Sequence, residues 1–209
     1  MNDSANATLE AATRNPHALT SRLLHLGVAV GVILQLLLST GMERPKPDAV
    51  RSTLESLSFE MHEFLGLSML ALILIWLVWL LRRRGEPVLS ELFPWTGHAG
   101  RNALMLSVRL TLHQARRGML AGETEIQPLV KTVHGLGFAC IALMAFSGTF
   151  VWLGMDDSGQ MPQWTHLVLE FHQFMATFAW IYLGGHAGMA LLHQFSGDNT
   201  LARMFSLRR

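Results

Sequence analysis

Four long apolar runs constrain the fold of this chain more than any other feature of its sequence. They cover roughly residues 20–42, 61–82, 129–153 and 164–195, and crossing a bilayer takes about 20 residues. A backbone in contact with lipid must satisfy its own hydrogen bonds, and these continuous, non-alternating runs do so as helices, not as barrel strands. We therefore predict an all-α membrane protein built as a four-transmembrane-helix bundle.

The composition agrees with this prediction. Half of the 209 residues are hydrophobic, 15% are charged and the mean hydropathy is +0.31, a balance that is unusual for a soluble domain. The net charge of +1 argues against nucleic acid as a partner. The first apolar run lacks the basic start and the cleavage site of a secretory signal. We expect it to remain in the protein as a transmembrane helix.

The distribution of basic residues predicts the orientation of the bundle. The segment 154–164, between the third and fourth runs, has no Lys or Arg, whereas the long segment between the second and third runs and the C-terminal tail are rich in Arg. By the positive-inside rule, both termini and the long central loop are cytoplasmic. The predicted organisation is a cytoplasmic N-terminal segment (1–19), a transmembrane domain (20–195) and a cytoplasmic basic tail (196–209).

Two segments outside the runs have the pattern of surface helices. The long loop, roughly 83–128, contains "HAGRNALMLSVRLTLHQARRGML", which mixes apolar and basic residues at helical spacing. This segment fits either a helix in the cytoplasmic membrane surface or a soluble amphipathic helix packed on the bundle. Residues 47–60 fit a separate short surface helix on the outer side.

The fourth run contains three histidines on one helical face. His172, His186 and His193 are fourteen and then seven residues apart, and each residue of an α-helix turns by about 100°. Ala176 and Ala179 lie on that face between the first two and leave room for a wide group. With the predicted orientation, His172 is near the outer side and His186 lies about 21 Å further in.

The histidines of all four runs fall into two layers. His62 and His172 form the outer layer, with His166 nearer the surface, and the inner layer holds His25, His134, His186 and His193. Two layers with histidines from different helices suit two bis-histidine haems, because neutral imidazole ligates iron without adding charge to the bilayer. Depth alone leaves His25, His134 and His193 open as the partner of His186.

The remaining candidates have ordinary alternatives. His134 and His193 lie at a membrane edge, where we expect structural or peripheral roles. Gly66 lies one turn from His62 and suits close approach of a flat macrocycle, although small residues also serve helix packing. Glu63 and Glu170 flank the outer histidines as candidate catalytic carboxylates for proton transfer, and ordinary interfacial charges would look the same.

The histidine segments resemble a known family. "RLLHLGVAV", "MHEFLGLSM" and "FHQFMATFAWIYLGGHAGMALLHQFSGDNTLARMF" are similar to the bacterial cytochrome b561 family, to which the di-haem b subunits of membrane hydrogenases are related. The resemblance implies two b haems held by the first, second and fourth helices. It assigns His25 and His186 to the cytoplasmic-side haem, and His62 and His172 to the outer-side haem. The long loop between the second and third runs departs from the compact family pattern.

The resemblance also implies a function. A di-haem b-type cytochrome of the bacterial inner membrane would transfer single electrons between the quinone pool and a redox partner. Ubiquinone or another quinone is the expected substrate, and a periplasmic or membrane redox protein, a small oxidant or reductant, and a second copy of the chain are candidate partners. The competing hypotheses are a histidine-lined metal-ion transporter and a membrane anchor subunit of a larger redox enzyme.

Overall fold

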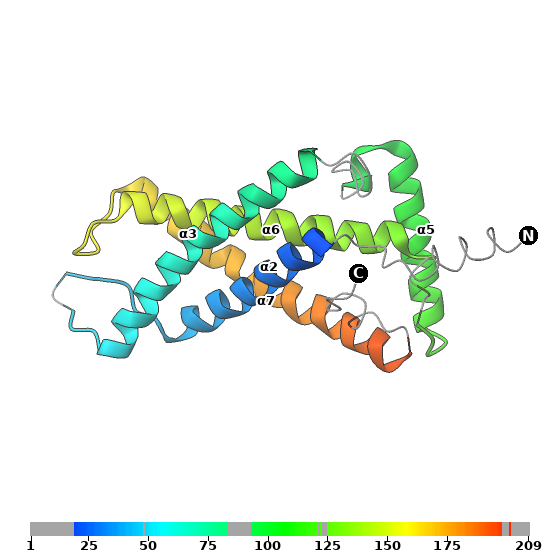
Figure 1. The fold of residues 1–209 in the computed structure, drawn as a ribbon, viewed down its shortest axis with the longest axis horizontal. Helices are drawn as coiled ribbons and strands as arrows, with labels where there is room; N and C mark the ends of the chain where they lie inside the picture. Colours follow the sequence, from blue (N-terminus) through cyan, green and yellow to red (C-terminus); the bar gives the residue numbers. More distant parts are fainter. Residues whose placement is uncertain are drawn as a thin grey trace, which may run out of the picture.

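The computed structural model describes residues 19–47, 49–82, 93–120, 122, 125–197 and 201, and every regular element in that part is a helix. The elements are α2 (Leu19–Gly41), α3 (Thr53–Arg82), the 3-10 helix η1 (Pro94–Thr96), α5 (His98–Ala115), α6 (Gln127–Gly154) and α7 (Gln163–Phe195) (Figure 1). Four of them, α2, α3, α6 and α7, are long and apolar enough to cross a membrane. The predicted all-α fold with four membrane spans is confirmed.

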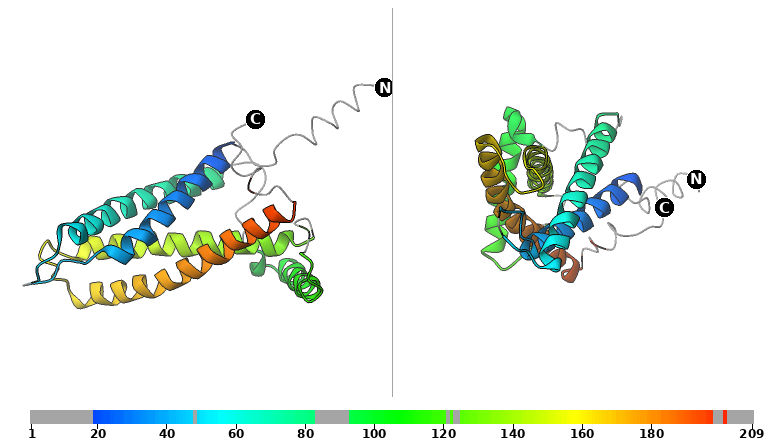
Figure 2. Two further views of the ribbon diagram at one scale, coloured as in Figure 1. Left: turned by 90° about the horizontal axis from the view of Figure 1, so that it is seen from below. Right: turned by 90° about the vertical axis from the view of Figure 1, so that its left-hand side faces the viewer.

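The four long helices are arranged as two hairpins. Close backbone packing joins α2 to α3 and α6 to α7, and the hairpins meet where α3 packs on α6. The long helices run roughly along one axis, and α5 lies across that axis at one end (Figures 1 and 2). We call this the α5 end of the bundle. The loops that follow α2 and α6 lie at the opposite end.

Helix α3 begins earlier than the sequence pattern suggested. The expected separate surface helix at residues 47–60 does not form, because Thr53–Phe59 continues directly into the second span. Ser52 starts the helix with a reciprocal cap: the Glu55 amide donates to Ser52 Oγ at 3.2 Å, and the Ser52 amide donates to Glu55 Oε2 at 2.8 Å. No Gly or Pro follows before Gly66, so nothing interrupts the helix.

The long loop contains the predicted amphipathic helix. Helix α5 packs on η1 and α6, and Ser107 on its packed side is 2% exposed. Gly100 lies so close to the Pro94 carbonyl oxygen that an added Cβ would clash with it. Packing on the bundle, one of the two alternatives for this helix, is therefore present, while its other side remains exposed.

The loops at the opposite end touch each other. Asp156 Oδ1 accepts hydrogen bonds from the Ser158 amide (3.0 Å), Ser158 Oγ (2.7 Å) and the Gln160 amide (2.9 Å). These hydrogen bonds lower the pKa of Asp156. The turn that they form presents Gly159 at φ 80° directly against the Pro45 carbonyl, where a Cβ would clash. Only glycine fits this position without strain.

We predict that Gly159→Ala destabilises the protein by about 2–4 kcal/mol, because backbone strain and a clash with Pro45 add together. Thermal unfolding in detergent would measure the loss. Gly118→Ala is the matched control, since Gly118 also has a positive φ of 68° but a Cβ added there would meet no atom within 4 Å. It should cost only about 1–2 kcal/mol. Equal losses would show that the contact between the two loops contributes nothing.

Candidate functional site

Two pairs of histidines face each other across the two hairpins. His25 of α2 and His186 of α7 have ring centroids 6.2 Å apart, with an interplanar angle of 55°. His62 of α3 and His172 of α7 have centroids 6.4 Å apart, with an angle of 89°. Each pair therefore takes one histidine from the first hairpin and one from α7.

The spacing within each pair fits two imidazoles on opposite sides of one metal ion. A bond between a metal and an imidazole nitrogen is about 2 Å, and the ring centre lies about 1.2 Å beyond the nitrogen. Two such arms in line place the ring centres about 6.4 Å apart. The observed separations of 6.2 and 6.4 Å agree with that value.

These histidines lie between helices whose backbones are not closely packed, a region that we call the seam. Among the described residues, extensive backbone packing joins α2 to α3 and α6 to α7, and does not join α7 to α2 or α3. The histidine rings therefore meet where the helix backbones are not in close contact. A flat group as wide as a macrocycle would insert in such a seam and not between tightly packed helices.

Residues of α6 fix His172, the histidine of α7 in the His62–His172 pair. Ser147 Oγ lies 2.9 Å from His172 Nδ1 and donates its own hydrogen to the Met144 carbonyl at 3.2 Å. His172 Nδ1 is therefore the donor to Ser147, and its Nε2 retains the lone pair that a metal requires. Gly148 keeps space for the same ring, because a Cβ there would lie 3.0 Å from His172 Cε1.

His62 is held through its backbone. Gln35 Nε2 of α2 donates to the His62 carbonyl at 3.1 Å. The buried Nδ1 of His62 has no hydrogen-bond partner among the described residues. A buried ring nitrogen without a partner is costly, and only a ligand or cofactor that contacts this nitrogen itself would offset that cost.

In the His25–His186 pair, the ring of His186 has two further ring neighbours. His134 of α6 lies edge-on to His186 with centroids 5.1 Å apart, and Tyr182 stacks on His186 at 5.3 Å and 9°. His134 Nδ1 donates to the Val130 carbonyl at 2.8 Å, which also leaves its Nε2 with a lone pair. The spacing of 5.1 Å is that of rings in direct contact, whereas the 6.2 Å of His25 leaves room for an ion. Ring spacing thus favours His25 as the partner of His186.

Sequence reasoning missed Ser147, Gln35 and Tyr182. Tyr182 is the only tyrosine of the chain and precedes His186 by four residues, so the two share a face of α7. That spacing was the one signal available. The contacts of Ser147 and Gln35 run between helices that are distant in sequence.

The other predicted site residues lie outside the pairs. Glu63 is half-buried on α3, and Glu170 is exposed on α7. Gly66 faces Gln35, whose Nε2 would be 2.9 Å from a Cβ, so the contact seen here is helix packing. His193 lies in the last turn of α7 and is 7% exposed. It is therefore more buried than we expected for a histidine at a membrane edge. His166 is exposed.

Ring contacts join His25 and His134 to His186, and His62 to His172. Among the described residues, no group of three or more His, Cys, Asp or Glu side chains could hold a metal ion. Such a group is the usual arrangement for a tetrahedral metal site.

Comparison with known proteins gives one match. The sequence profile described as prokaryotic cytochrome b561 matches residues 17–207. No curated protein and no solved structure matches the chain. The matched region includes all four long helices and all of the candidate histidines.

We predict that Gly137→Ala destabilises the α6–α7 hairpin by about 1–3 kcal/mol, because the added methyl would overlap the Tyr182 ring. Tyr182→Leu in the same chain should recover part of the loss by removing the ring. A thermal double-mutant cycle measures this coupling. Additive effects of the two substitutions would show that Gly137 and Tyr182 do not fit together as described.

Proposed function

Since the chain belongs to the prokaryotic cytochrome b561 family, and is thereby a membrane cytochrome that transfers electrons through haem b, we propose that it holds two haems, one on each histidine pair. The observation that carries this proposal is the ring spacing of 6.2 and 6.4 Å in two pairs that share α7. Both values suit bis-histidine ligation of one iron by each pair.

In this proposal, His25 and His186 would hold the haem at the α5 end, the end that the positive-inside rule favours as cytoplasmic. His62 and His172 are the ligands of the haem toward the outer side. When bound, haem supplies a one-electron redox centre. Ser147 orients His172 and keeps its Nε2 available, while Tyr182 and His134 restrict the orientation of His186.

The proposed activity is transfer of single electrons between the quinone pool and a redox partner, in the bacterial inner membrane. Ubiquinone or another quinone is the proposed substrate at one side, and a periplasmic or membrane redox protein or a small molecule is the partner at the other. The depth of the two pairs supports this proposal: His172 and His186 are fourteen residues apart on α7, about 21 Å along the helix. One pair therefore lies toward each membrane surface.

We predict that each ligand substitution removes one haem only. His62→Ala or His172→Ala should lose the outer-side haem, and His25→Ala or His186→Ala should lose the haem at the α5 end, because a single imidazole retains haem weakly. The haem-to-protein ratio and the reduced-minus-oxidised spectrum of the purified protein measure the loss.

The matched control for this series is His134→Ala, which removes a histidine in contact with His186 and should retain both haems. One haem in this variant together with two in His25→Ala would exchange the roles of His25 and His134. Two haems in His186→Ala would overturn the assignment at the α5 end. A protein purified without haem, despite adequate haem supply, would overturn the whole proposal.

We also predict that Ser147→Ala weakens retention of the outer-side haem without preventing its binding. Loss of a hydrogen-bond partner behind a metal-ligating histidine typically costs 10–100-fold in metal affinity, so haem transfer to an excess of apomyoglobin should be about tenfold faster or more. Ser39→Ala is the control, because Ser39 Oγ donates to the Leu36 carbonyl on α2. Equal transfer rates in the two variants would exclude a role for Ser147.

A further inference from the structure

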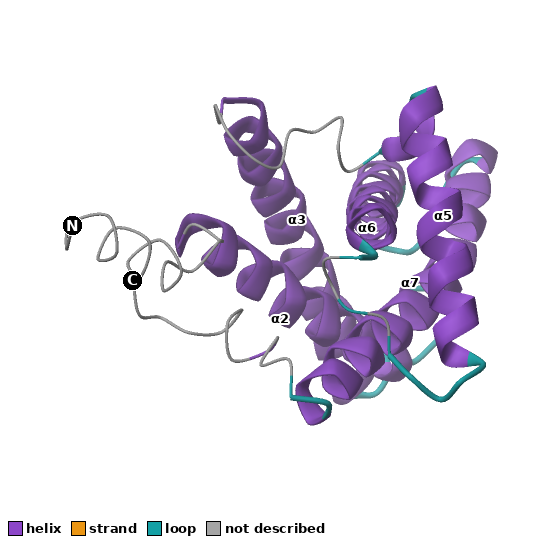
Figure 3. Ribbon diagram, turned by 90° about the vertical axis from the view of Figure 1, so that its right-hand side faces the viewer, coloured by secondary structure: helices purple, strands orange, loops and turns teal. Residues whose placement is uncertain are grey.

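Helix α5 lies where a membrane surface would be. Figures 1 and 3 show it crossing the bundle axis at the level where α6 begins. In Figure 1, α7 ends close to this level, at Phe195, whereas α2 begins further from it, at Leu19. A helix that crosses the direction of the membrane spans at their ends lies roughly parallel to the bilayer plane.

One side of α5 carries an exposed apolar stripe. Met105 is 60% exposed, Val108 37% and Leu112 54%, and positions i, i+3 and i+7 share a helix face. The packed side is different, since Ser107 is 2% exposed there. Large apolar side chains on a helix of otherwise low hydrophobicity are typical of helices that lie in the membrane interface.

Basic residues lie on the same face of α5 as the stripe, since Arg101, Arg109 and Arg116 are all within about 40° of Met105 around the helix. Arg109 and Arg116 are exposed and share a face seven residues apart, with Arg101 and Arg117 also exposed. The sequence has no Asp or Glu from residue 93 to residue 122. Among the residues that the structure describes, no carboxylate forms an ion pair with any of these arginines. Glu125, the described carboxylate that contacts α5, accepts a hydrogen bond from Gln114 Nε2 at 3.1 Å.

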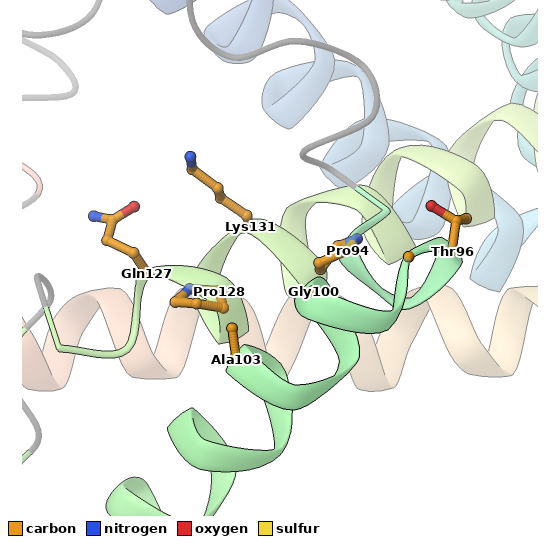
Figure 4. Close-up of a pocket in the computed structure, with 8 residues that line it drawn as sticks. Pro94, Thr96, Gly100, Ala103, Gln127, Pro128 and Lys131 are labelled. Carbon is orange, nitrogen blue, oxygen red and sulfur yellow. The ribbon is translucent and has the colours of Figure 1, made fainter.

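The start of α5 is fixed on the bundle. A pocket of about 410 Å³ lies where η1, α5 and α6 meet, lined by residues that include Pro94, Gly100, Gln127 and Lys131. Figure 4 shows the Lys131 side chain projecting from α6 beside this corner. Lys131 adds a further positive charge at this level, and the close approach of Gly100 to Pro94 fixes the corner from which α5 extends.

We propose that α5 is an interfacial helix that binds the anionic phospholipids of the leaflet at the α5 end. Met105, Val108 and Leu112 enter the boundary of the acyl chains, and Arg109, Arg116 and Arg117 bind lipid phosphates through charge-assisted hydrogen bonds. Charge complementarity and the level of the helix favour this occupant over a soluble protein. The proposal rests on the four membrane spans and not on the haem assignment.

Amide hydrogen exchange of the whole protein in nanodiscs tests this proposal. Nanodiscs would contain phosphatidylcholine alone or an equal mixture with phosphatidylglycerol. In the wild type, amides of α5 should exchange at least about fivefold more slowly with phosphatidylglycerol, since a single arginine near an anionic surface contributes a factor of about five. The difference should shrink as ionic strength rises.

The variant R109Q/R116Q/R117Q should lose this lipid dependence, and K46Q/R51Q at the opposite end should retain it. The variant M105S/L112S should exchange faster in both lipids. Equal exchange of wild-type α5 in the two lipids, or an undiminished difference in the triple variant, would overturn the proposal. The haem spectrum recorded on the same samples reports the haem assignment separately, because none of the substituted residues contacts a histidine pair.

Discussion

The cost of an unsatisfied polar group in hydrocarbon governs this structure. It forces the backbone of the four spans into helices, and it requires a partner for each polar side chain that the spans carry. Ser147, Thr132 and Thr149 meet this requirement locally by donating to carbonyls of the preceding turn. An imidazole ring has two nitrogens, and a hydrogen bond to a carbonyl of the preceding turn satisfies only one of them. The histidines therefore meet other side chains across the helices.

Helix α7 is the common element of the site. It provides one histidine to each pair, and a spacing of fourteen residues returns both to nearly the same face. The distance between the pairs is consequently set by the pitch of one continuous helix, whereas their partners come from two different helices, α2 and α3. Loss of His25 or His62 thus removes a ligand from one pair, while a bend in α7 would affect both.

Much of the fold followed from the sequence, because long apolar runs extend over many residues and tolerate local error. The early start of α3 was missed because the polar residues 53–60 suggested a break, although Ser52 and Glu55 contained the capping signal. At the site, depth grouped His62 with His172. It could not choose among His25, His134 and His193 as the partner of His186, because the spacing of rings on different helices cannot be read from a one-dimensional pattern.

The division into two hairpins has a consequence for membrane biogenesis. Helices α2 and α3 bury Gly31 against Met69, and α6 and α7 bury Gly137 against Tyr182, so each hairpin has close packing of its own. Each can form as a unit when it leaves the insertion machinery. Joining the hairpins then depends on α3 packing on α6 and on the histidines that face each other across the seam. Insertion of the chain before haem is supplied would leave the joining of the two hairpins mainly to the packing of α3 on α6.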